Sequence, residues 1–405
     1  MKITNCRNCY KKKLSHLFSL GKISFTGKFP KKNHTVKKAP LDLVICNQCK
    51  LVQLSHKFNL RYLYGPDYGY RSGINTTMVN HLKTVVLKAI KKVKIKQNDM
   101  VLDIASNDAT LLKNYSKKII TFGIDPLVNK YKSNYKNINY KVSDFFSKNK
   151  IKKKTQKKFK IITALSVFYD SEKPNKFLKD VENILDDNGL FILEFADLAS
   201  IIKKKMFDTI CHEHLEYYSS KIILKMCEKN GLKIIDIFKN DINGSSKQFY
   251  ITKLNSKFKI NKVKVNSIIK EENKMKIHSK TTILKFFNEI NKIKINLLKL
   301  VKKIKSKNQT IHAYGASTKG NVLLQYFGIG STYLDFVSER NPRKFNLYTP
   351  GTKIKIISEN KSRKIKPNYY LVLPWHFKKE ILNREKNIRS KGTKFIFPLP
   401  RIEVY

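Results

Sequence analysis

Apolar runs that alternate with amphipathic segments dominate the middle of the chain. Residues 76–93, TTMVNHLKTVVLKAIKKV, carry apolar side chains at the three- and four-residue spacing of a helix with one buried face. The runs MVLDI, IITFGID and KKFKIITALSV predict buried strands, and VENILDDNGLFILEF predicts a helix, an Asn-Gly turn and another strand. KIILKMCEKNG then predicts a helix, followed by strands at LKIIDIF and KQFYITKL. Alternating strands and helices of this kind indicate a parallel sheet in an α/β domain.

The two ends of the chain follow different patterns. Residues 1–65 hold four of the six cysteines and show little regular periodicity. Residues 259–307 are Lys-rich, with helical spacing and no strand signal, which indicates a helical connector, and strands and helices return after it. We therefore predict four parts: a small Cys-rich module (1–75), an α/β domain (76–256), a helical linker (257–308) and a second α/β domain (309–405).

The formal net charge of +53 is the most unusual feature of the composition. Such a charge is typical of proteins that bind nucleic acid, and a zinc-containing nucleic-acid-binding protein or an RNA methyltransferase is the alternative interpretation. The lysines are nevertheless spread over the whole chain. We therefore expect a diffuse basic surface that attracts small anions, and no specific binding site for nucleic acid or membrane. The N-terminus lacks a secretory pattern and no apolar run is long enough to cross a bilayer, so we expect a soluble, cytoplasmic protein.

Two pairs of cysteines form the most specific local signal. Cys6 and Cys9 make one C-x-x-C knuckle, and Cys46 and Cys49 make a second. Four thiolates in two knuckles supply the tetrahedral sulfur shell that structural Zn²⁺ prefers, and they leave no open position for catalysis. Cys227, on an amphipathic segment, is expected to be a buried apolar residue.

The stretch VLDIASNDATLL predicts a strand that ends at Asp103, small residues, and then a helix. It occupies the place of a Gly-rich nucleotide loop but does not read G-x-G-x-x-G. The next strand ends in Asp125, 22 residues later, where a carboxylate can bind ribose hydroxyls. A ribose-binding site without a phosphate-binding loop suits S-adenosylmethionine (SAM) better than a dinucleotide. The candidate cofactor residues are Asp103, Ala105, Ser106, Asn107, Asp108, Asp125 and Asp144.

Two further stretches carry polar chemistry. DTICHEHLEYYSS, residues 208–220, does not fit the His-Glu-x-x-His metal pattern and is better interpreted as a group of acids and bases that handle a proton. AYGASTKGN follows a predicted strand and opens a helix, so its backbone N–H groups and Lys319 can form an anion site. The same stretch is equally consistent with a simple helix cap at Ser317 or Thr318.

Taken in order, the cysteine module, SNDATLL, HEHLEYYS, DINGSS, YGASTKGNVLLQY, PGTKI and LPWHF resemble the three-domain SAM-dependent sugar C-methyltransferases. The resemblance extends over essentially the whole chain. It implies a class I SAM methyltransferase domain with a Rossmann-like sheet, an N-terminal zinc module and a second Rossmann-like domain that helps to hold a nucleotide-linked ketosugar.

The resemblance also implies a reaction. A ketone acidifies the neighbouring C–H group, a base removes that proton, and the enolate carbon attacks the sulfonium methyl. We expect His214 to be the base and Glu213 to orient it or replace it. His212, Tyr70, Tyr169 and Tyr218 are candidate donors to the enolate oxygen. The candidate substrate-binding residues are Asn243, Gly244, Tyr314, Gly315, Ser317, Lys319, Asn321 and His376.

The chain departs from the family pattern at several of these places. Alanines stand at Ala105 and Ala109, where relatives usually carry glycines, and Cys211 and Tyr169 stand where relatives often carry Tyr and His. NGSS and the following Lys-Gln pair also differ from the usual sequence. These departures imply a substrate that differs from the best-known deoxyaminosugars. Methyl transfer to oxygen or nitrogen, or a degenerate scaffold, are the other interpretations.

Overall fold

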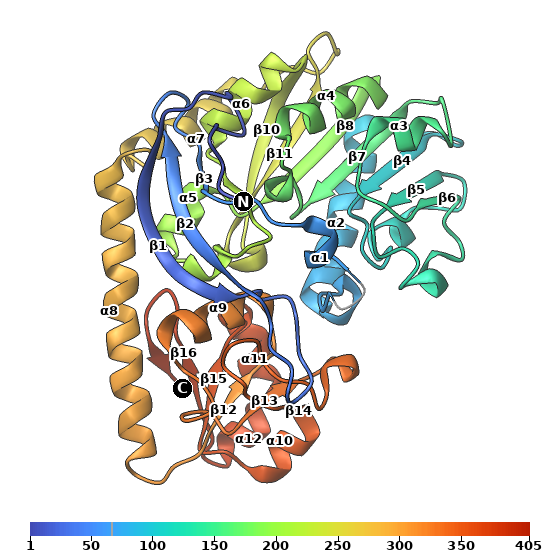
Figure 1. Ribbon diagram of the computed structural model, residues 1–405. Coiled ribbons are helices and arrows are strands. Elements are labelled where there is room, and N and C mark those ends of the chain that lie inside the picture. The colour runs from blue at the N-terminus through green and yellow to red at the C-terminus, as the bar shows by residue number, and fades with distance from the viewer. Residues whose placement is uncertain (66–67) are drawn as a thin grey trace.

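The computed structural model describes residues 1–65 and 68–405, which form three β-sheets and a long connecting helix (Figure 1). The seven-stranded central sheet has the order β10-β11-β8-β7-β4-β5-β6. Its strands from β4 to β8 are parallel, whereas β11 runs antiparallel to both β8 and β10. This is the predicted class I methyltransferase sheet, with the last strand inserted beside β8. The strands are β4 (Met100–Ile104), β5 (Ile120–Ile124), β6 (Tyr140–Val142), β7 (Phe159–Leu165), β8 (Leu185–Phe195), β10 (Leu232–Asn240) and β11 (Ser246–Lys253).

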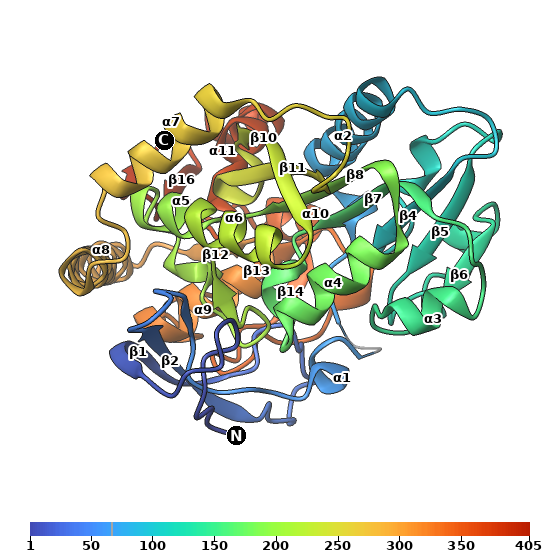
Figure 2. The same ribbon diagram turned by 90° about the horizontal axis from the view of Figure 1, so that it is seen from above.

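Helices cover both faces of this sheet. Figure 2 shows α2 on one face and α4 and α6 on the other. Helix α2 has the predicted bounds, Thr76–Val93, and begins where the Asn75 side chain accepts a hydrogen bond from the Met78 N–H group. Cys227 is fully buried on α6, as expected. The other helices of this part are α1 (Leu60–Leu63), α3 (Lys148–Lys152), α4 (Pro174–Ile184), α5 (Leu198–Lys203) and α6 (Ser220–Lys229).

The predicted helix after β4 is wrong. Residues 105–111 form turns, and only a short 3₁₀ turn, Leu112–Asn114, follows. The cause is local: Ala105, Asn107 and Ala109 have φ angles of 59°, 49° and 60°, which a right-handed helix does not allow. The predicted Asn-Gly turn falls inside β8, which begins at Leu185. The register against β7 shifts there, from Phe159–Leu185 to Ile161–Leu190, so Asn188 and Gly189 lie in an irregularity of the strand.

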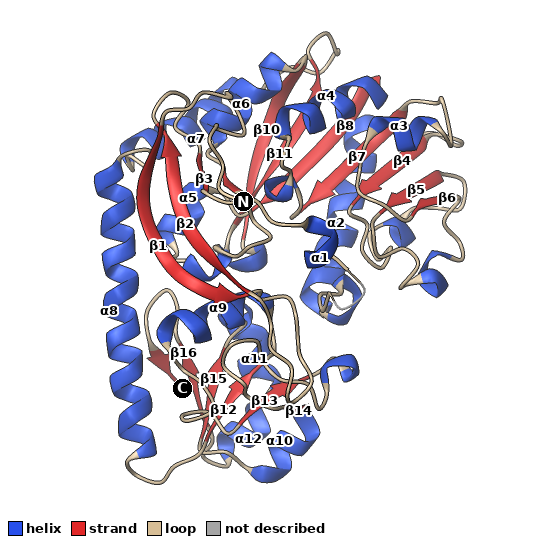
Figure 3. Ribbon diagram, in the orientation of Figure 1, coloured by secondary structure: helices blue, strands red, loops and turns tan. Residues whose placement is uncertain are grey.

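The N-terminal sheet contains strands that the sequence pattern did not reveal. Its order is β1-β2-β3-β9, and all of its pairs are antiparallel. The long, curved strands β1 and β2 lie beside helix α8 (Figure 3), where the rings of Phe18 and Phe287 stack at 4.3 Å. Strand β9 comes from the central part of the chain, directly after the HEH segment, which we define as residues 211–215. The strands are β1 (Leu14–Ser24), β2 (Lys38–Cys46), β3 (Val52–Leu54) and β9 (Glu216–Tyr217).

The C-terminal sheet, β14-β13-β12-β15-β16-β17, is parallel except for β17 and forms the predicted second α/β layer. The connector is helical, as predicted, and consists of α7 (Lys262–Lys274) and α8 (Lys280–Lys305). Within residues 1–65 and 68–405, none of the helices combines the length and the apolar character needed to cross a membrane. The remaining elements are β12 (Ile311–Tyr314), α9 (Thr318–Phe327), β13 (Phe336–Glu339), β14 (Ile356–Ser358), α10 (Glu359–Ile365), β15 (Tyr369–Val372), α11 (Lys378–Arg384), α12 (Lys386–Ser390), β16 (Lys394–Phe397) and β17 (Glu403–Val404).

The left-handed backbone after β4 yields a stability prediction. Ala105 pays a steric cost at its φ of 59° that glycine avoids, so we expect Ala105→Gly to raise the free energy of unfolding by about 1 kcal/mol. Ala89→Gly is the matched control, because Ala89 is buried within helix α2 and its replacement should destabilise by about 1 kcal/mol or more. Urea unfolding followed by circular dichroism measures both changes, and a destabilised Ala105→Gly variant would contradict the strain argument.

Candidate active site

A cavity of about 750 Å³ lies where the central sheet, the HEH segment and the C-terminal sheet meet. Its volume falls in the range of small-molecule sites. Its walls come from the carboxyl ends of β4, β5 and β7 on one side and of β12, β13 and β15 on the other, which is where ligands bind in open α/β sheets. The predicted site residues that line it are Tyr70, Asp103, Ala105, Ser106, Asn107, Asp125, Asp144, Tyr169, Glu213, His214, Asn243, Tyr314, Gly315, Ser317, Lys319 and His376.

Buried carboxylates form the cofactor side of this cavity. Asp125 accepts hydrogen bonds from the backbone N–H groups of Asn107 (2.9 Å) and Leu127 (2.6 Å), and Asp103 accepts one from the Thr163 hydroxyl (2.6 Å). Burial raises the pKa of Asp103 to about 7 and that of Asp125 to about 6. Both carboxyl groups retain lone pairs for a ligand and would be stabilised in their ionised form by a cation. These residues fit SAM, which brings ribose hydroxyls together with a sulfonium and an ammonium group.

Asp108 does not line the cavity, but it fixes the segment that precedes α2. Its carboxylate accepts hydrogen bonds from the Arg71 side chain (2.9 Å) and from the Gly73 N–H group (3.1 Å). Asp144 lines the cavity near Phe145 and forms ion pairs with Arg61 and Lys150. The predicted cofactor residues thus divide into those that face the cavity and Asp108, which shapes the loop around it.

One ring nitrogen of His214 has no hydrogen-bond partner within residues 1–65 and 68–405. Its Nδ1 lies 2.7 Å from the Thr209 carbonyl oxygen, and because a carbonyl only accepts, Nδ1 carries the proton and Nε2 keeps its lone pair. Burial, together with the charge of Lys319, lowers the pKa of His214 to about 3, so the imidazole is neutral at physiological pH. The ring of Tyr169 lies 4.1 Å from that of His214.

Glu213 does not orient His214, contrary to prediction; that position belongs to the Thr209 carbonyl. The Glu213 carboxylate instead faces the N-terminal sheet, where the Thr26 hydroxyl donates to it at 3.5 Å. A side chain at Gly27 would collide with Glu213 Oε1 at 2.8 Å and touch the Tyr68 ring at 3.5 Å, so Glu213 and Tyr68 approach the same stretch of backbone. Burial raises the pKa of Glu213, and burial followed by the Glu213 charge raises that of Tyr68.

The tyrosine beside Glu213 is therefore Tyr68, which the sequence motif did not single out. The predicted Tyr70 is 43% exposed, and its carbonyl oxygen lies against Asn107 of the cofactor loop. Tyr68 and Tyr70 both lie in the short stretch YGYRSG, residues 68–73, so sequence spacing alone could not choose between them. Only the contact with residues 26–27 distinguishes the two.

Two predicted proton donors lie outside the cavity. His212 is fully buried, with its ring at 4.6 Å from Phe25 and 4.9 Å from Phe58, and its Nε2 lies 3.1 Å from the Ala39 carbonyl oxygen. Tyr218 is also fully buried and packs against Phe168 at 5.0 Å. Neither residue lines the cavity, so the geometry gives no support to their predicted roles as donors to an enolate.

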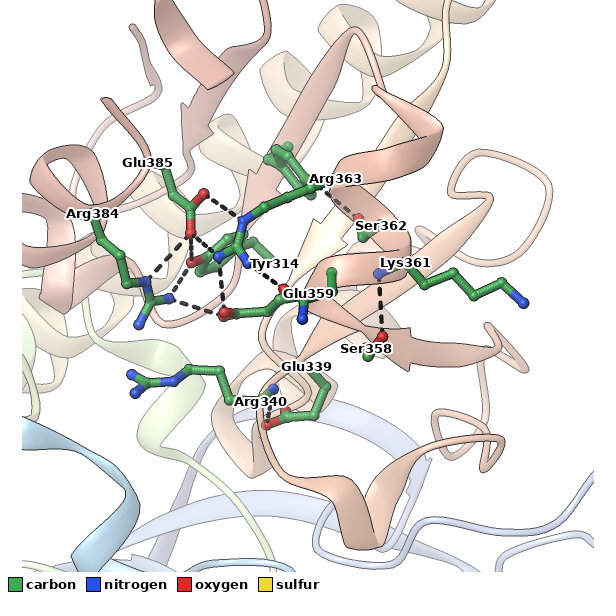
Figure 4. Close-up of polar contacts among 12 residues, drawn as sticks. Tyr314, Glu339, Arg340, Ser358, Glu359, Lys361, Ser362, Arg363, Arg384 and Glu385 are labelled. Carbon is green, nitrogen blue, oxygen red and sulfur yellow. Dashed lines mark hydrogen bonds and ion pairs between the residues drawn. The ribbon is translucent and has the colours of Figure 1, made fainter. Parts of the chain in front are cut away.

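Some of the predicted substrate-binding residues of the C-terminal domain form hydrogen bonds within that domain. The Tyr314 hydroxyl donates to Glu385 at 2.7 Å within a network that includes Arg363, Arg384 and Glu359 (Figure 4). Ser317 is the N-cap of α9, and its hydroxyl accepts the Gly320 N–H group at 3.0 Å. These two groups hold the cavity wall in place: the Tyr314 O–H donor is used by Glu385, whereas the Ser317 hydroxyl accepts a bond and keeps its O–H donor.

Asn321 and Gly244 also serve structural contacts and do not line the cavity. The Asn321 amide donates to the Thr26 carbonyl oxygen at 2.7 Å and so joins α9 to the N-terminal sheet. Gly244 has a φ of 103° and packs against Trp375, which leaves no room for a side chain. Their predicted contact with substrate has no support in this geometry and stays a prediction.

The four predicted zinc ligands lie together. All four sulfur atoms are within 4.8 Å of one another, and the Cys6–Cys49 and Cys9–Cys46 pairs are 3.5 Å apart. Tetrahedral zinc with Zn–S bonds of about 2.3 Å requires sulfur separations of about 3.8 Å, so the cluster fits the metal. The Gln53 amide donates to the Cys6 sulfur at 3.2 Å, as expected beside a metal-bound thiolate.

Three known domain families match consecutive parts of the chain. Residues 6–64 match a "Putative zinc binding domain", residues 78–237 a "Methyltransferase domain" and residues 241–400 a "C-methyltransferase C-terminal domain". The chain is also 26% identical over 370 residues to C-methyltransferase NovU of Streptomyces niveus, covering 90% of this chain and 87% of the relative. The chain is a three-domain SAM-dependent C-methyltransferase.

Solved methyltransferase structures align with less than half of this C-methyltransferase. A SAM-dependent methyltransferase from Clostridium acetobutylicum is 15% identical and covers 43% of this chain and 91% of its own, with a TM-score of 0.35. Magnesium protoporphyrin IX methyltransferase from Synechocystis, solved with bound SAH, is 16% identical and covers 48% of this chain and 92% of its own, with a TM-score of 0.34.

We expect zinc to hold the HEH segment of the C-methyltransferase in place. The knuckle residue Cys46 ends β2, and β3 pairs with β9, which follows His214 by two residues. Removal of zinc by a chelator, or Cys49→Ser, should speed amide hydrogen exchange at residues 52–54 and 211–217 by at least about tenfold, while β4 keeps its protection. Cys227→Ser, away from the cluster, should leave zinc content and exchange at these residues unchanged. Unchanged exchange in a zinc-free protein would show that the metal has no such effect.

The raised carboxyl pKa values predict how SAM binding depends on pH. A bound sulfonium and ammonium favour the ionised forms of Asp103 and Asp125, so binding must release protons where these groups are still protonated. We expect the affinity for SAM to rise between about pH 5 and pH 8, and calorimetry in buffers of different ionisation enthalpy to show proton release near pH 6.5. Asp103→Asn should remove the part of this dependence near pH 7. Equal affinities at both ends of the range would contradict the assignment.

Proposed function

We propose that this C-methyltransferase moves the methyl group of SAM to a carbon next to the ketone of a nucleotide-linked sugar. One observation carries the proposal: His214, whose Nε2 keeps its lone pair, lines the same cavity as the carboxylates that fit SAM. A carbon acid requires a base, because the proton must leave before carbon becomes nucleophilic. The sequence resemblance supplies the ketosugar as the substrate class.

The cofactor would be held by the carboxyl ends of β4, β5 and β6. Asp125 would bind the ribose hydroxyls, Asp144 and Phe145 the adenine, and Asp103 the cationic end. When bound, SAM supplies an electrophilic methyl group on a positively charged sulfur. The protein then has to remove a proton, exclude water and align the acceptor carbon.

His214 would remove the proton through Nε2. The hydrogen bond from Nδ1 to the Thr209 carbonyl fixes the ring and its tautomer, so the lone pair has a defined direction. Its lowered pKa keeps this lone pair available throughout the neutral range. Glu213, whose pKa burial raises, is the alternative base, since it also lines the cavity and lies near Tyr68.

Arginines on the cavity wall would bind the nucleotide diphosphate. Arg71, Arg340 and Arg384 line the cavity and come from three separate segments. Figure 4 shows Arg384 tied to Glu359 and Glu385, whereas the Arg340 guanidinium points away from that network. Arg340 lies 3.9 Å from the Glu380 carboxylate, beyond hydrogen-bond distance, and can turn its planar donors toward a phosphate.

The test uses labelled SAM with dTDP-, GDP- and CDP-linked ketosugars in deuterated water. We expect methyl transfer to carbon and exchange of the neighbouring C–H for deuterium by the wild-type protein. His214→Gln should lower both rates by about 100-fold or more and change the SAH Kd by less than about twofold.

His16→Gln, at an exposed position of the N-terminal sheet, is the matched control and should leave both rates unchanged. Full activity of His214→Gln together with loss in Glu213→Gln would assign the base to Glu213. Methyl transfer to oxygen or nitrogen, without carbon exchange, would refute the proposed reaction.

A further inference from the structure

Lys319 reaches from the C-terminal domain into the centre of the active site. It is the second residue of α9, and its ammonium donates to the Asn243 carbonyl oxygen at 2.8 Å, in the loop that joins β10 and β11. Within residues 1–65 and 68–405 this is its one hydrogen bond, and no carboxylate oxygen lies within 4.0 Å. An ammonium has three N–H donors, so two remain for a ligand in the cavity that Lys319 lines.

The neighbours of Lys319 are the groups of the reaction centre. Its charge acts on His214 and His376, whose pKa values are lowered first by burial and then by this ammonium. His376 lines the cavity, and its Nδ1 is buried without a hydrogen-bond partner among the described residues. The carboxylate that partly offsets the ammonium is Asp208, which already accepts a hydrogen bond from Trp375 Nε1 at 2.8 Å.

A partly buried ammonium with so little compensation needs an anionic group in the cavity. The diphosphate is a poor candidate, because the arginines suited to it come from the segments around residues 71, 340 and 384, whereas Lys319 lies against the loop that contains Asn243 and beside His214. A phosphate at Lys319 would compete with the ketone for space, because Lys319 and His214 line the same cavity. The remaining anion of the reaction is the enolate oxygen.

We propose that Lys319, with His376 beside it, binds the ketone oxygen of the substrate and stabilises the enolate that His214 generates. This role rests on the proposed function and adds that the C-terminal domain takes part in the chemistry. The C–H electron pair becomes the C=C bond, the carbonyl π pair moves to oxygen, and the proton goes to Nε2. As the carbon bonds to the methyl group, the carbonyl re-forms, sulfur keeps the pair of the broken C–S bond, and His214 returns its proton to water.

The enolate also removes an electrostatic conflict between the two groups. A protonated His214 beside the Lys319 ammonium is unfavourable, and this repulsion contributes to the low basicity of His214 before the reaction. A negative oxygen beside both cations replaces the repulsion with two attractions as the proton moves. Lys319 therefore makes proton removal by His214 more favourable, because it stabilises the enolate that this proton removal produces.

The experiment compares Lys319→Met with Arg340→Met, using the ketosugar that the wild-type protein exchanges and free dTDP, GDP and CDP as nucleotide probes. Lys319→Met should lower the deuterium-exchange rate at saturating substrate by about 100-fold or more, and change the Kd for the nucleotide diphosphate and for SAH by less than about twofold. Arg340→Met should weaken diphosphate binding by about tenfold and keep the saturated exchange rate within about threefold. Lys319→Arg, which keeps the charge, should recover part of the lost rate.

Each result has a definite meaning. Wild-type exchange in Lys319→Met, or a loss of diphosphate affinity in that variant without a loss of exchange, would overturn the enolate role. A wild-type protein that exchanges none of the ketosugars would instead refute the proposed function, and with it the enolate that Lys319 is assigned to bind. Thermal melting and SAH affinity establish that each variant is folded.

Discussion

The pairing of β3 with β9 is the interaction on which the active site depends. Strand β9 has two residues and cannot persist alone, so its backbone needs the ladder that β3 offers through Val52–Tyr217 and Gln53–Glu216. The same ladder continues into the HEH segment, where the Leu54 N–H group donates to the Leu215 carbonyl at 2.9 Å. Because β3 follows the second cysteine knuckle, a zinc cluster without an open coordination position can still decide where His214 lies.

The HEH segment is held by each of the three sheets. The Leu215 N–H group donates to the Tyr169 carbonyl at 2.7 Å, which joins the segment to the end of β7. On the third side, Trp375 of the C-terminal domain donates to Asp208, just before the segment. The reaction centre is therefore built from all three domains. The hydrogen bond from Asn321 to the Thr26 carbonyl also links the C-terminal domain directly to the N-terminal sheet. This arrangement explains why the cavity forms only where all three meet.

Most features with a local cause could be predicted from the sequence, whereas features with a long-range cause could not. The 3.6-residue spacing of α2 and the Cys-x-x-Cys knuckles depend on neighbouring residues, and the structure confirms both. Strands β1 and β2, by contrast, lie with their convex side toward helix α8, and irregularities in the pairing of β1 break its alternation. The Glu213 side chain contacts Thr26, 187 residues away in sequence. Nothing in the local sequence therefore indicates that Glu213 does not orient the His214 ring. Left-handed alanines after β4 were equally hidden, since alanine ordinarily favours a helix.

The low basicity of His214 links the chemistry to the architecture. A histidine with a carboxylate partner would hold its proton more tightly and titrate near neutrality, whereas a backbone carbonyl orients His214 without adding a charge. The positive charge in this site lies instead on Lys319, from another domain, where it can act on the substrate oxygen. Tyr169, which packs on His214, has its pKa raised by burial and remains a neutral hydroxyl. The base, His214, and the cation, Lys319, are thus separate residues from different domains. Proton removal is favourable only when the substrate ketone is bound where it can contact both.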